Sequence, residues 1–427
     1  MEFLAFILFL ARSSIDPLFQ AVPIKVAGME MTGGAFLNLA ILGFVGLMIL
    51  TRPTSAFPFR AWLPFLLVAA ASITWSPDKG GGIRALLVLV TYASLFAVPF
   101  LVKAYFRHSA YLLKAVIYSS IVPVAVGALE LVFFLDPSSR VKSTFAHPNV
   151  FAFYLMVVLG VIYFLLSSSA VQFKPSVRKL MISYSGLLVG LIIMTQTRAA
   201  WVGTFLIVAT YAACINRRYL FVVLLLPLLI FVPSVSHRLA DLERGTAYTG
   251  AIGSRADELN SFAWRQLMWK SAFIDVAETP FFGKGLASFA PNSLKFFPAA
   301  GTSKSDQRGL GAHSAFVQAF YETGAVGFVC YFVIFITLFF RILRHFKDDP
   351  RGAIMLASTI LAYMMANFSD NMFDYGTANL YFWGFVGIVF AKWAQQRNWA
   401  QQQSVFSFSP SRLAYPYRVP AKTISLS

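Results

Sequence analysis

Five stretches that lie far apart in the chain contain polar side chains suited to a substrate with a negatively charged leaving group. Arginine binds phosphate oxygens through a planar pair of N–H donors and stays charged at any working pH. Histidine titrates near neutral pH, so it can accept a proton from an attacking hydroxyl. The residues are His147 and Asn149 in FAHPN, Arg198 in TQTRAAW, Arg265 in WRQLMWK, His313 in GAHSAF, and Asp370, Asn371 and Asp374 in NFSDNMFDY. Together these residue types fit the displacement of a phosphate leaving group by a hydroxyl.

Each stretch also has a purely structural interpretation. Proline is favoured at the first position of a helix, so FAHPN fits a helix start as well as a binding site. Arg198 can extend its charged end to the membrane surface, Arg265 can hold lipid phosphates, and His313 can cap its helix. For the three polar residues of the last stretch we favour turn and cap roles, because Asp and Asn are common there.

The composition places the elements that carry these residues in a membrane. Of the 427 residues, 58% are hydrophobic and 12% are charged, and the mean hydropathy is +0.68. A helix of about 20 apolar residues spans the hydrocarbon layer, and backbone polar groups in lipid must be satisfied within the segment. We therefore predict an all-α polytopic membrane protein with about twelve transmembrane helices. The predicted spans are residues 1–22, 33–51, 61–76, 84–103, 110–135, 149–168, 181–197, 199–215, 219–235, 313–340, 352–368 and 376–396.

The distribution of lysine and arginine predicts which side each connection faces. With the amino terminus inside, the cytoplasmic side receives 19 of the 35 basic residues, short outer loops receive 7, and one long loop holds 9. An excess of basic residues marks the cytoplasmic side, so both termini are predicted to be cytoplasmic. The first segment lacks the positive start and the cleavage site of a signal peptide, and we retain it as a helix. The net charge of +17 follows from this bias, and the basic residues are not interleaved with aromatic ones, so no nucleic-acid partner is expected.

The predicted spans divide the chain into four parts. Transmembrane helices 1 to 9 occupy residues 1–235, a long outer loop occupies 236–312, helices 10 to 12 occupy 313–396, and a cytoplasmic tail occupies 397–427. The tail lacks periodicity, and we predict that it is disordered. A loop as long as 236–312 usually carries function.

One segment of the long loop is predicted to be an amphipathic helix. Phe262, Leu267, Met268 and Phe273 recur at helical spacings, and the pattern stops at Pro280. Such a helix is typical of a segment that lies on the outer membrane–water boundary.

An ordered set of motifs resembles the shared core of the bacterial O-antigen ligase and polymerase superfamily. One part is the stretch from Trp264 to Phe289, followed after a spacer by AHS at 312–314 and ETGAVG at 322–327. FAHPN, TRAAW, the many-helix layout and one large outer loop before the late helices complete the resemblance. It covers about two thirds of the chain, and its specificity lies in the ordered combination rather than in TRAAW alone.

The resemblance implies an activity, a fold and a set of functional residues. Members have a GT-C-like fold and transfer a glycan from a polyprenyl diphosphate carrier to an acceptor hydroxyl on the periplasmic face. A lateral opening lined by Phe and Leu is expected for the polyprenyl tail. The expected catalytic residues are His313, Arg265 and Arg198, and the expected substrate-binding residues are Arg198, Arg265, His147 and Asn149. This chain departs from the usual family pattern at His147 and Ser314, and these departures bear on which acceptor is used.

The expected reaction is a single displacement at an anomeric carbon. His313 takes the proton of the acceptor hydroxyl while the arginines neutralise the charge that grows on the diphosphate. Without a carboxylate nucleophile beside the histidine, the reaction inverts the anomeric configuration. The diphosphate is already a good leaving group, and the chain has no GxxxxGK[ST] loop, so no cofactor is expected.

The last polar stretch and the two cysteines are the alternative candidates for a metal site or a disulfide. Asp370, Asn371 and Asp374 can hold Mg²⁺ in place of the arginine charge. Two basic residues already neutralise the charge of the diphosphate, so no metal is expected. Cys214 and Cys330 fall in predicted spans at opposite ends of the chain, where they fill space rather than pair or bind a metal.

Among the activities of the superfamily we favour the ligase, which joins O-antigen to lipid A-core in lipopolysaccharide biosynthesis. The alternative is a polymerase of O-antigen or exopolysaccharide, and a protein O-glycosyltransferase is less favoured because those usually carry a larger periplasmic portion. A transporter of lipid-linked sugar is the alternative from another class, but only Glu130 falls plausibly within the membrane. The expected partners are an undecaprenyl-diphosphate-linked glycan, lipid A-core and membrane lipids, and we expect a monomer in the bacterial inner membrane.

Overall fold

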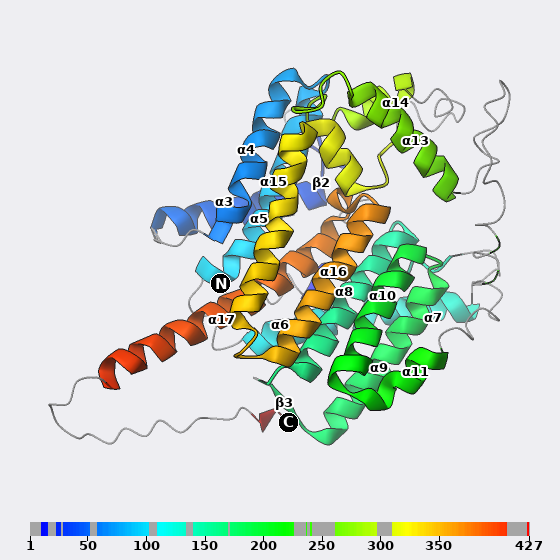
Figure 1. Ribbon diagram of the computed structural model, residues 1–427. Coiled ribbons are helices and arrows are strands. Elements are labelled where there is room, and N and C mark those ends of the chain that lie inside the picture. Colours follow the sequence, from blue (N-terminus) through cyan, green and yellow to red (C-terminus); the bar gives the residue numbers. More distant parts are fainter. Residues whose placement is uncertain are drawn as a thin grey trace.

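The described part of the chain is mostly helical (Figure 1). The computed structural model describes residues 10–15, 23–26, 29–51, 58–101, 109–133, 140–169, 171–225, 236, 240, 261–296, 310–407 and 425–426. The strands are short: β1 (Pro23–Val26) pairs antiparallel with β2 (Met29–Thr32), and β3 (Gln172–Phe173) pairs in parallel with β4 (Ser425–Leu426). The predicted class, an all-α polytopic membrane protein, is confirmed.

Eight helical segments of the described residues are long and apolar enough to cross a membrane. They are α3 (Gly33–Thr51), α5 (Lys79–Leu101), α6 with α7 (Ser109–Ser119 and Ile121–Phe133), α8 (Pro148–Ser167), α9 (Pro175–Met194), α10 (Arg198–Thr210) with the π-helical turn η4 (Tyr211–Ile215), α15 (Ala315–His345) and α16 (Pro350–Ser369). The remaining helical elements are η1 (Pro58–Ala61), α4 (Leu63–Ser72), η2 (Ile73–Trp75), η5 (Arg217–Tyr219), α11 (Leu220–Leu225), α13 (Ser261–Val276), α14 (Phe289–Phe296), η9 (Met372–Asp374) and α17 (Gly376–Ser407).

The predicted spans coincide with helices wherever the structure describes them, but fewer than twelve reach membrane length. The span predicted at 61–76 is the short pair α4 and η2, and α17 is not among the eight because polar residues follow its apolar first half. Most of the first predicted span, 1–22, and most of the ninth, 219–235, lie outside the described residues. Helix α17 continues to Ser407, into the segment predicted as a tail.

Helix α8 forms the centre of the core. Every residue from Val150 to Ser167 is buried, and α8 packs against α9, α10, α16 and α17. A helix that is apolar on all sides is typical of the centre of a membrane bundle. Glycines permit close approach, since Gly160 lies against Thr359 of α16 and Gly203 of α10 lies against α8. This packing fixes the starts of α8 and α10, where FAHPN and TRAAW lie.

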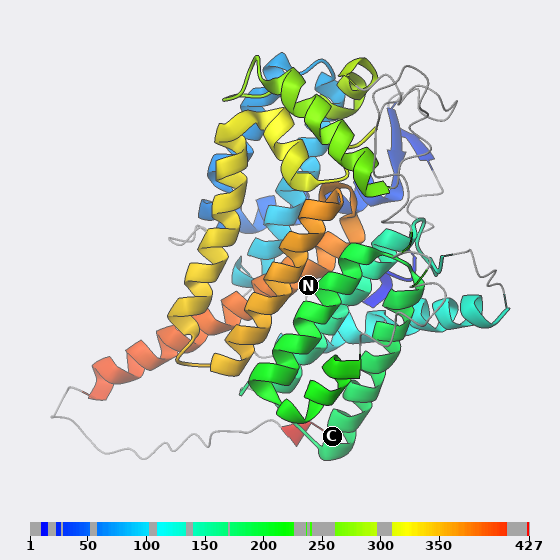
Figure 2. The same ribbon diagram turned by 45° about the vertical axis from the view of Figure 1, so that its right-hand side comes forward.

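Helix α15 is broken near its start. Gly324 has a φ of 68° and a ψ of −171°, a positive φ that glycine adopts without a steric penalty. Four main-chain hydrogen bonds join residues 280–285 to residues 321–326 across the break. This seam attaches the segment that follows α13 to α15, and in both ribbon views α13 lies beside the first turns of α15 (Figures 1 and 2).

The predicted helix of the long loop exists as α13, but its buried face differs in part from the predicted one. Met268, Ala272 and Val276 are buried in a small core shared with α14 and α15. Phe262 and Phe273, which the sequence pattern assigns to the apolar face, are 47% and 46% exposed. One stripe of α13 therefore packs on α15 while large apolar side chains remain on its surface.

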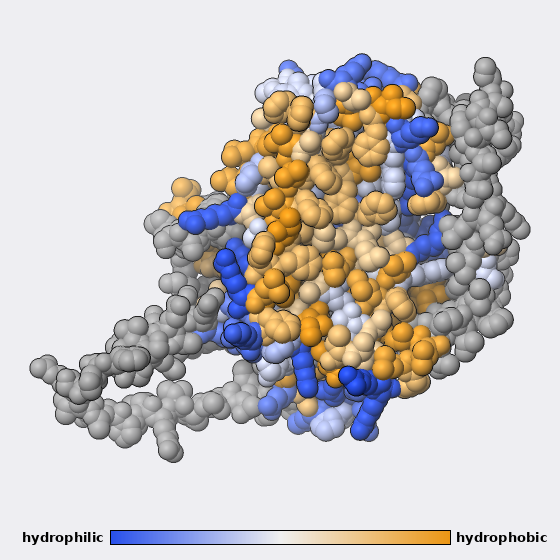
Figure 3. All heavy atoms as spheres, viewed as in Figure 1, coloured by the Kyte–Doolittle hydropathy of each residue, from blue (hydrophilic) through white to orange (hydrophobic). Residues whose placement is uncertain are grey.

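On the face drawn in Figure 3, apolar side chains cover most of the middle of the bundle, and hydrophilic side chains lie near its two ends and along part of its margins. Exposed side chains on the sides include Leu67 of α4 and Val329 and Phe340 of α15. Helices with such faces are suited to contact with lipid hydrocarbon.

Candidate active site

His313 lies directly before α15 in a strained backbone conformation. Its φ is 47°, which is uncommon for a residue with a side chain and is found at functional positions. The N-cap is Ser314, whose hydroxyl accepts the N–H of Val317 at 3.3 Å, so the capping role considered for His313 belongs to its neighbour. The imidazole is 41% exposed and packs against Trp264 of α13, with ring centroids 5.7 Å apart.

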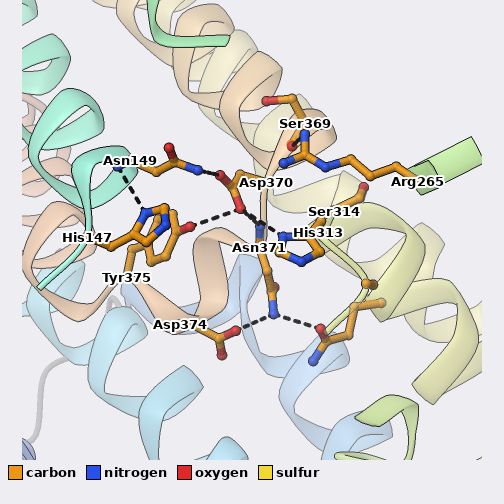
Figure 4. A network of polar contacts seen from close by, with 12 residues as sticks. His147, Asn149, Arg265, His313, Ser314, Ser369, Asp370, Asn371, Asp374 and Tyr375 are labelled. Atoms are coloured by element: carbon orange, nitrogen blue, oxygen red, sulfur yellow. Dashed lines mark hydrogen bonds and ion pairs between the residues drawn. The ribbon is translucent and has the colours of Figure 1, made fainter. Parts of the chain in front are cut away.

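Asp370, which ends α16, is the centre of a polar network (Figure 4). Its Oδ1 lies 3.7 Å from Nδ1 of His313 and accepts hydrogen bonds from the Tyr375 hydroxyl at 2.9 Å and the Asn371 N–H at 3.0 Å. Its Oδ2 accepts from Nδ2 of Asn149 at 2.5 Å. A buried carboxylate with donors on both oxygens keeps one orientation. Because Oδ1 faces Nδ1 of His313, the proton of a neutral ring belongs on Nδ1, and Nε2 is left to accept another.

Asn149 connects Asp370 to the loops before α8 and α10. Its Oδ1 accepts from Nη2 of Arg140 at 2.6 Å and from the Thr197 hydroxyl at 3.1 Å. Arg140 donates in addition to the Thr197 hydroxyl at 3.0 Å and to the Thr195 carbonyl at 2.8 Å. These bonds hold the starts of α8 and α10 against the end of α16.

His147 is the N-cap of α8. Its Nδ1 accepts the N–H of Asn149 at 3.2 Å, and Pro148 occupies the first helical position. Burial lowers the pKa of His147, and the nearby charge of Arg140 lowers it further against the opposing effect of Asp370. The ring is therefore neutral at neutral pH, as its accepting Nδ1 requires. The helix-start interpretation of FAHPN is confirmed, and a role of His147 in binding substrate stays a prediction.

Arg265 reaches the same site from α13. Its Nη1 donates to the carbonyl of Ser369 at 2.7 Å, one residue before Asp370. One turn further along α13, Nε1 of Trp269 donates at 2.7 Å to the carbonyl of the residue that precedes His313. Burial alone would raise the pKa of Asp370, but the contact with His313 and the charge of Arg265 outweigh it, and the pKa lies below its ordinary value. Asp370 is therefore ionised at neutral pH.

Arg198 is the first residue of α10 and directly follows Thr197. It is connected to Asp370 through the hydroxyl of Thr197 and the amide of Asn149. The structure thus brings His147, Asn149, Arg265 and His313 together around Asp370, and it places Arg198 at the margin of this network.

A second carboxylate, Asp374 of η9, lies on the other side of Asn371. The Asn371 Nδ2 donates to Asp374 Oδ2 at 2.5 Å and to Gln318 Oε1 at 2.7 Å. Burial raises the pKa of Asp374 to about 6 against the hydrogen bond from Asn371. The Asp374 side chain is exposed to a cavity of about 1020 Å³ that residues of α3, α5, α15 and α17 line.

A comparison with families of known proteins gives this geometry a context. Residues 183–332 match the family model described as O-Antigen ligase. This segment is therefore similar to the O-antigen ligase family domain. It contains Arg198, Arg265 and His313, so the resemblance to the O-antigen ligase and polymerase superfamily is confirmed for the part that carries the expected catalytic residues. A comparison with curated proteins finds no match.

The O-antigen ligase family domain holds only part of the polar network. Arg140, Asn149 and Asp370 lie outside the matched residues and approach the domain from α8, α16 and the loops beside them. Three further residues of the network, Arg140, Gln318 and Tyr375, are not indicated by any pattern in the sequence. Their sequence signal is weak, because a lone arginine, glutamine or tyrosine at a helix end has no distinctive spacing.

The loop considered for Mg²⁺ forms a hydrogen-bonded turn beside the family domain. Both oxygens of Asp370 accept hydrogen bonds from protein donors, and the amide of Asn371 donates to Asp374. Asp370 caps the carboxyl end of α16, which is the cap role favoured from the sequence. Across the described ranges, no group of three or more His, Cys, Asp or Glu side chains is placed to hold a metal ion.

Proposed function

We propose that the protein is an O-antigen ligase that transfers O-antigen glycan from undecaprenyl diphosphate to lipid A-core, on the periplasmic face of the inner membrane. The observation that carries the proposal is the position of His313 beside the buried carboxylate of Asp370, with Arg265 reaching the same point from α13. The family domain supports transfer of this general kind. The excess of basic residues on the opposite side supports a periplasmic site.

His313 acts as the general base in this reaction. The acceptor hydroxyl gives its proton to Nε2 as its oxygen bonds to the anomeric carbon of the donor. The imidazolium that forms carries its second proton on Nδ1, facing Asp370, whose negative charge stabilises it. The distance of 3.7 Å is longer than a hydrogen bond, and such contacts often tighten only when substrate is present.

The arginines stabilise the leaving group. As the bond between the anomeric carbon and the diphosphate oxygen breaks, its electron pair passes to the diphosphate, and negative charge grows there. Arg265 and Arg198 are proposed to bind these phosphate oxygens. A preorganised cation at such a point is worth several kcal/mol in the transition state, or about 100- to 1000-fold in rate. No step needs a metal ion or ATP, and the single displacement inverts the anomeric configuration.

The cavity beside Asp374 is suited to the polyprenyl chain of the donor. One wall consists of aliphatic side chains of α3 and α5, among them Leu39, Ile83 and Leu87. These three are 44%, 54% and 38% exposed, so part of the wall is open. The polar end is formed by Gln318 and Asp374. An apolar chamber with a polar end next to the catalytic network supports a lipid-linked donor.

A defined assay tests the proposed function. Purified protein in liposomes receives undecaprenyl-diphosphate glycan together with lipid A-core, or the donor alone, each with and without excess EDTA. The ligase proposal expects glycan on lipid A-core in the first arm, insensitive to EDTA and with inverted configuration. Lengthened carrier-linked glycan in the donor-only arm would establish a polymerase instead. Movement of labelled donor across the bilayer without any new product would establish a transporter.

A further inference from the structure

Arg140 is held by the protein on the side that faces the catalytic network. Its Nε donates to the carbonyl of Thr195 at 2.8 Å, and its Nη2 donates to Asn149 Oδ1 at 2.6 Å and to the Thr197 hydroxyl at 3.0 Å. Two nitrogens of the guanidinium are therefore directed at residues before α8 and α10. A group held in this way is suited to orient its neighbours.

The contact with Arg140 fixes the orientation of the Asn149 amide. A guanidinium can only donate hydrogen bonds, and a carboxylate that is ionised can only accept them. The amide oxygen must therefore face Arg140, and the amide nitrogen must face Asp370, as the structure shows. Reversal of the amide would place two donors together at one end and two acceptors together at the other. With Arg140 absent, the Thr197 hydroxyl would be the remaining donor to Asn149 Oδ1.

The orientation of the Asn149 amide determines how the Asp370 carboxylate faces His313. Asn149 holds Oδ2 at 2.5 Å, which turns Oδ1 toward His313. Tyr375 and Asn371 donate to Oδ1 as well, but Asn149 is the donor that the described contacts place on Oδ2. The sequence of contacts runs from Arg140 to Asn149, then to Asp370, and ends at His313 (Figure 4 shows the last three).

We propose that Arg140 is a positioning residue for His313, acting through Asn149 and Asp370, and that it does not bind the diphosphate of the donor. The inference rests on the proposed function for the meaning of His313. It separates Arg140 from Arg265, whose described hydrogen bond goes to the main-chain carbonyl of Ser369 rather than to a side chain of the network. Loss of a positioning residue lowers kcat and leaves the KM for donor unchanged, whereas loss of a residue that binds the phosphate of the bound donor raises this KM.

A double-mutant cycle tests the route through Asn149. Arg140→Gln and Asn149→Ala are each expected to lower kcat by about 10- to 100-fold, with the donor KM within about threefold of wild type. The double variant is expected to be no slower than the slower single variant, because both remove the same chain of contacts. Arg140→Lys should recover part of the rate, since one ammonium can reach Asn149 but cannot reproduce the planar fork. Arg351→Gln, an exposed arginine in the first turn of α16, is the matched control and should behave as wild type.

Two kinetic results would overturn the inference. A raised donor KM with unchanged kcat in Arg140→Gln would make Arg140 a phosphate ligand. Multiplicative effects in the double variant would show that Arg140 and Asn149 act independently. Thermal unfolding of each variant distinguishes loss of the fold from loss of positioning, and Arg140→Lys keeps the test valid when Arg140→Gln does not fold.

A chemical measurement decides the inference without any transfer assay. The rate at which diethyl pyrocarbonate modifies His313 is followed by peptide mass spectrometry in wild type, Arg140→Gln, Asp370→Asn and Arg351→Gln. Arg140→Gln and Asp370→Asn are expected to change this rate in the same direction, and Arg351→Gln is expected to leave it unchanged. An Arg140→Gln rate equal to wild type would refute positioning. If wild type transfers glycan to neither acceptor, the proposed function fails, and the labelling result still decides the role of Arg140.

Discussion

The carboxylate of Asp370 faces Nδ1 of His313 at 3.7 Å, although one residue ends α16 and the other precedes α15. The carboxylate is 3% exposed and the imidazole is 41% exposed. A buried anion behind an accessible ring leaves the outer nitrogen free to meet a substrate and stabilises the ring once it is protonated. This division of roles makes the pair suited to general-base chemistry.

Replacement of His313 tests its proposed role as the general base. His313→Ala is expected to lower the rate of glycan transfer by about 100- to 10000-fold while leaving insertion and thermal stability close to wild type, because Ser314 rather than His313 caps α15. Transfer is measured with purified protein in liposomes. His345→Ala changes a histidine at the other end of α15 and serves as control. Wild-type transfer by His313→Ala would remove the proposed role.

Replacement of Asp370 tests its support of the His313 ring and removes a contribution to stability that depends on pH. Asp370→Asn is expected to slow transfer roughly 100-fold, because the amide cannot stabilise an imidazolium as a carboxylate does. The pKa of Asp370 is lowered in the folded protein, so its ionisation stabilises the fold above the unfolded pKa of about 3.9, and this stability is lost as the pH falls. The difference in melting temperature between wild type and Asp370→Asn should therefore be largest near neutral pH and should shrink below about pH 4. Equal melting temperatures at pH 7 would contradict the pairing.

Replacement of Arg265 tests charge stabilisation. Arg265→Ala is expected to lower kcat/KM for the donor by about 100- to 1000-fold, and Arg265→Lys by less, because lysine keeps the charge but lacks the planar fork. Arg198→Ala is expected to act in the same direction. Lys270→Ala removes a cation from the same helix and should be close to wild type. A loss of equal size in Lys270→Ala would mean that net charge on α13, rather than Arg265, governs the reaction.

Local patterns in the sequence were sufficient to find most helices. The span predicted at 33–51 coincides with α3, and those predicted at 149–168 and 352–368 differ from α8 and α16 by one or two residues at each end. Runs of apolar residues bounded by polar and proline residues carry this information directly. The break at Gly324 could not be read in this way, because it lies in a continuous apolar run and depends on hydrogen bonds to residues 280–285.

The motifs indicate residues that the structure brings together, but the contacts between these residues depend on tertiary structure. Asn149 and Asp370 are 221 residues apart in the chain, and Arg140 and Thr197 are 57 apart. No spacing rule connects such pairs. For Asp370 the sequence favoured a cap role, and the structure shows that a capping residue can also hold His313, since its main chain ends α16 while its carboxylate faces the ring.

The carboxyl group of Asp374 should make the protein less stable as the pH rises. Its pKa is raised to about 6, so ionisation costs stability from the unfolded pKa of about 3.9 upward, and the full penalty is present above pH 6. Asp374→Asn removes this group and should raise the melting temperature relative to wild type at pH 7.5 but not at pH 4. Asp348→Asn, an exposed carboxyl at the end of α15, should show no such gain. A lower melting temperature of Asp374→Asn at pH 7.5 would mean that its hydrogen bond with Asn371 outweighs the cost of its charge.

The seam between α15 and residues 280–285 should fail when Gly324 acquires a side chain. A Cβ at this position would meet the main chain of Phe281, and the residue has a φ of 68°, so Gly324→Ala is expected to lower the free energy of unfolding by at least about 2 kcal/mol. Gly190→Ala is the matched control, because this glycine lies within α9 with open space around its Cα, and alanine there should stabilise the helix by up to about 1 kcal/mol. Thermal unfolding in detergent measures both. Since the seam also holds α13 over the site, Gly324→Ala should slow transfer even at temperatures where it remains folded, whereas an intact rate in a destabilised variant would show that the seam supports the fold alone.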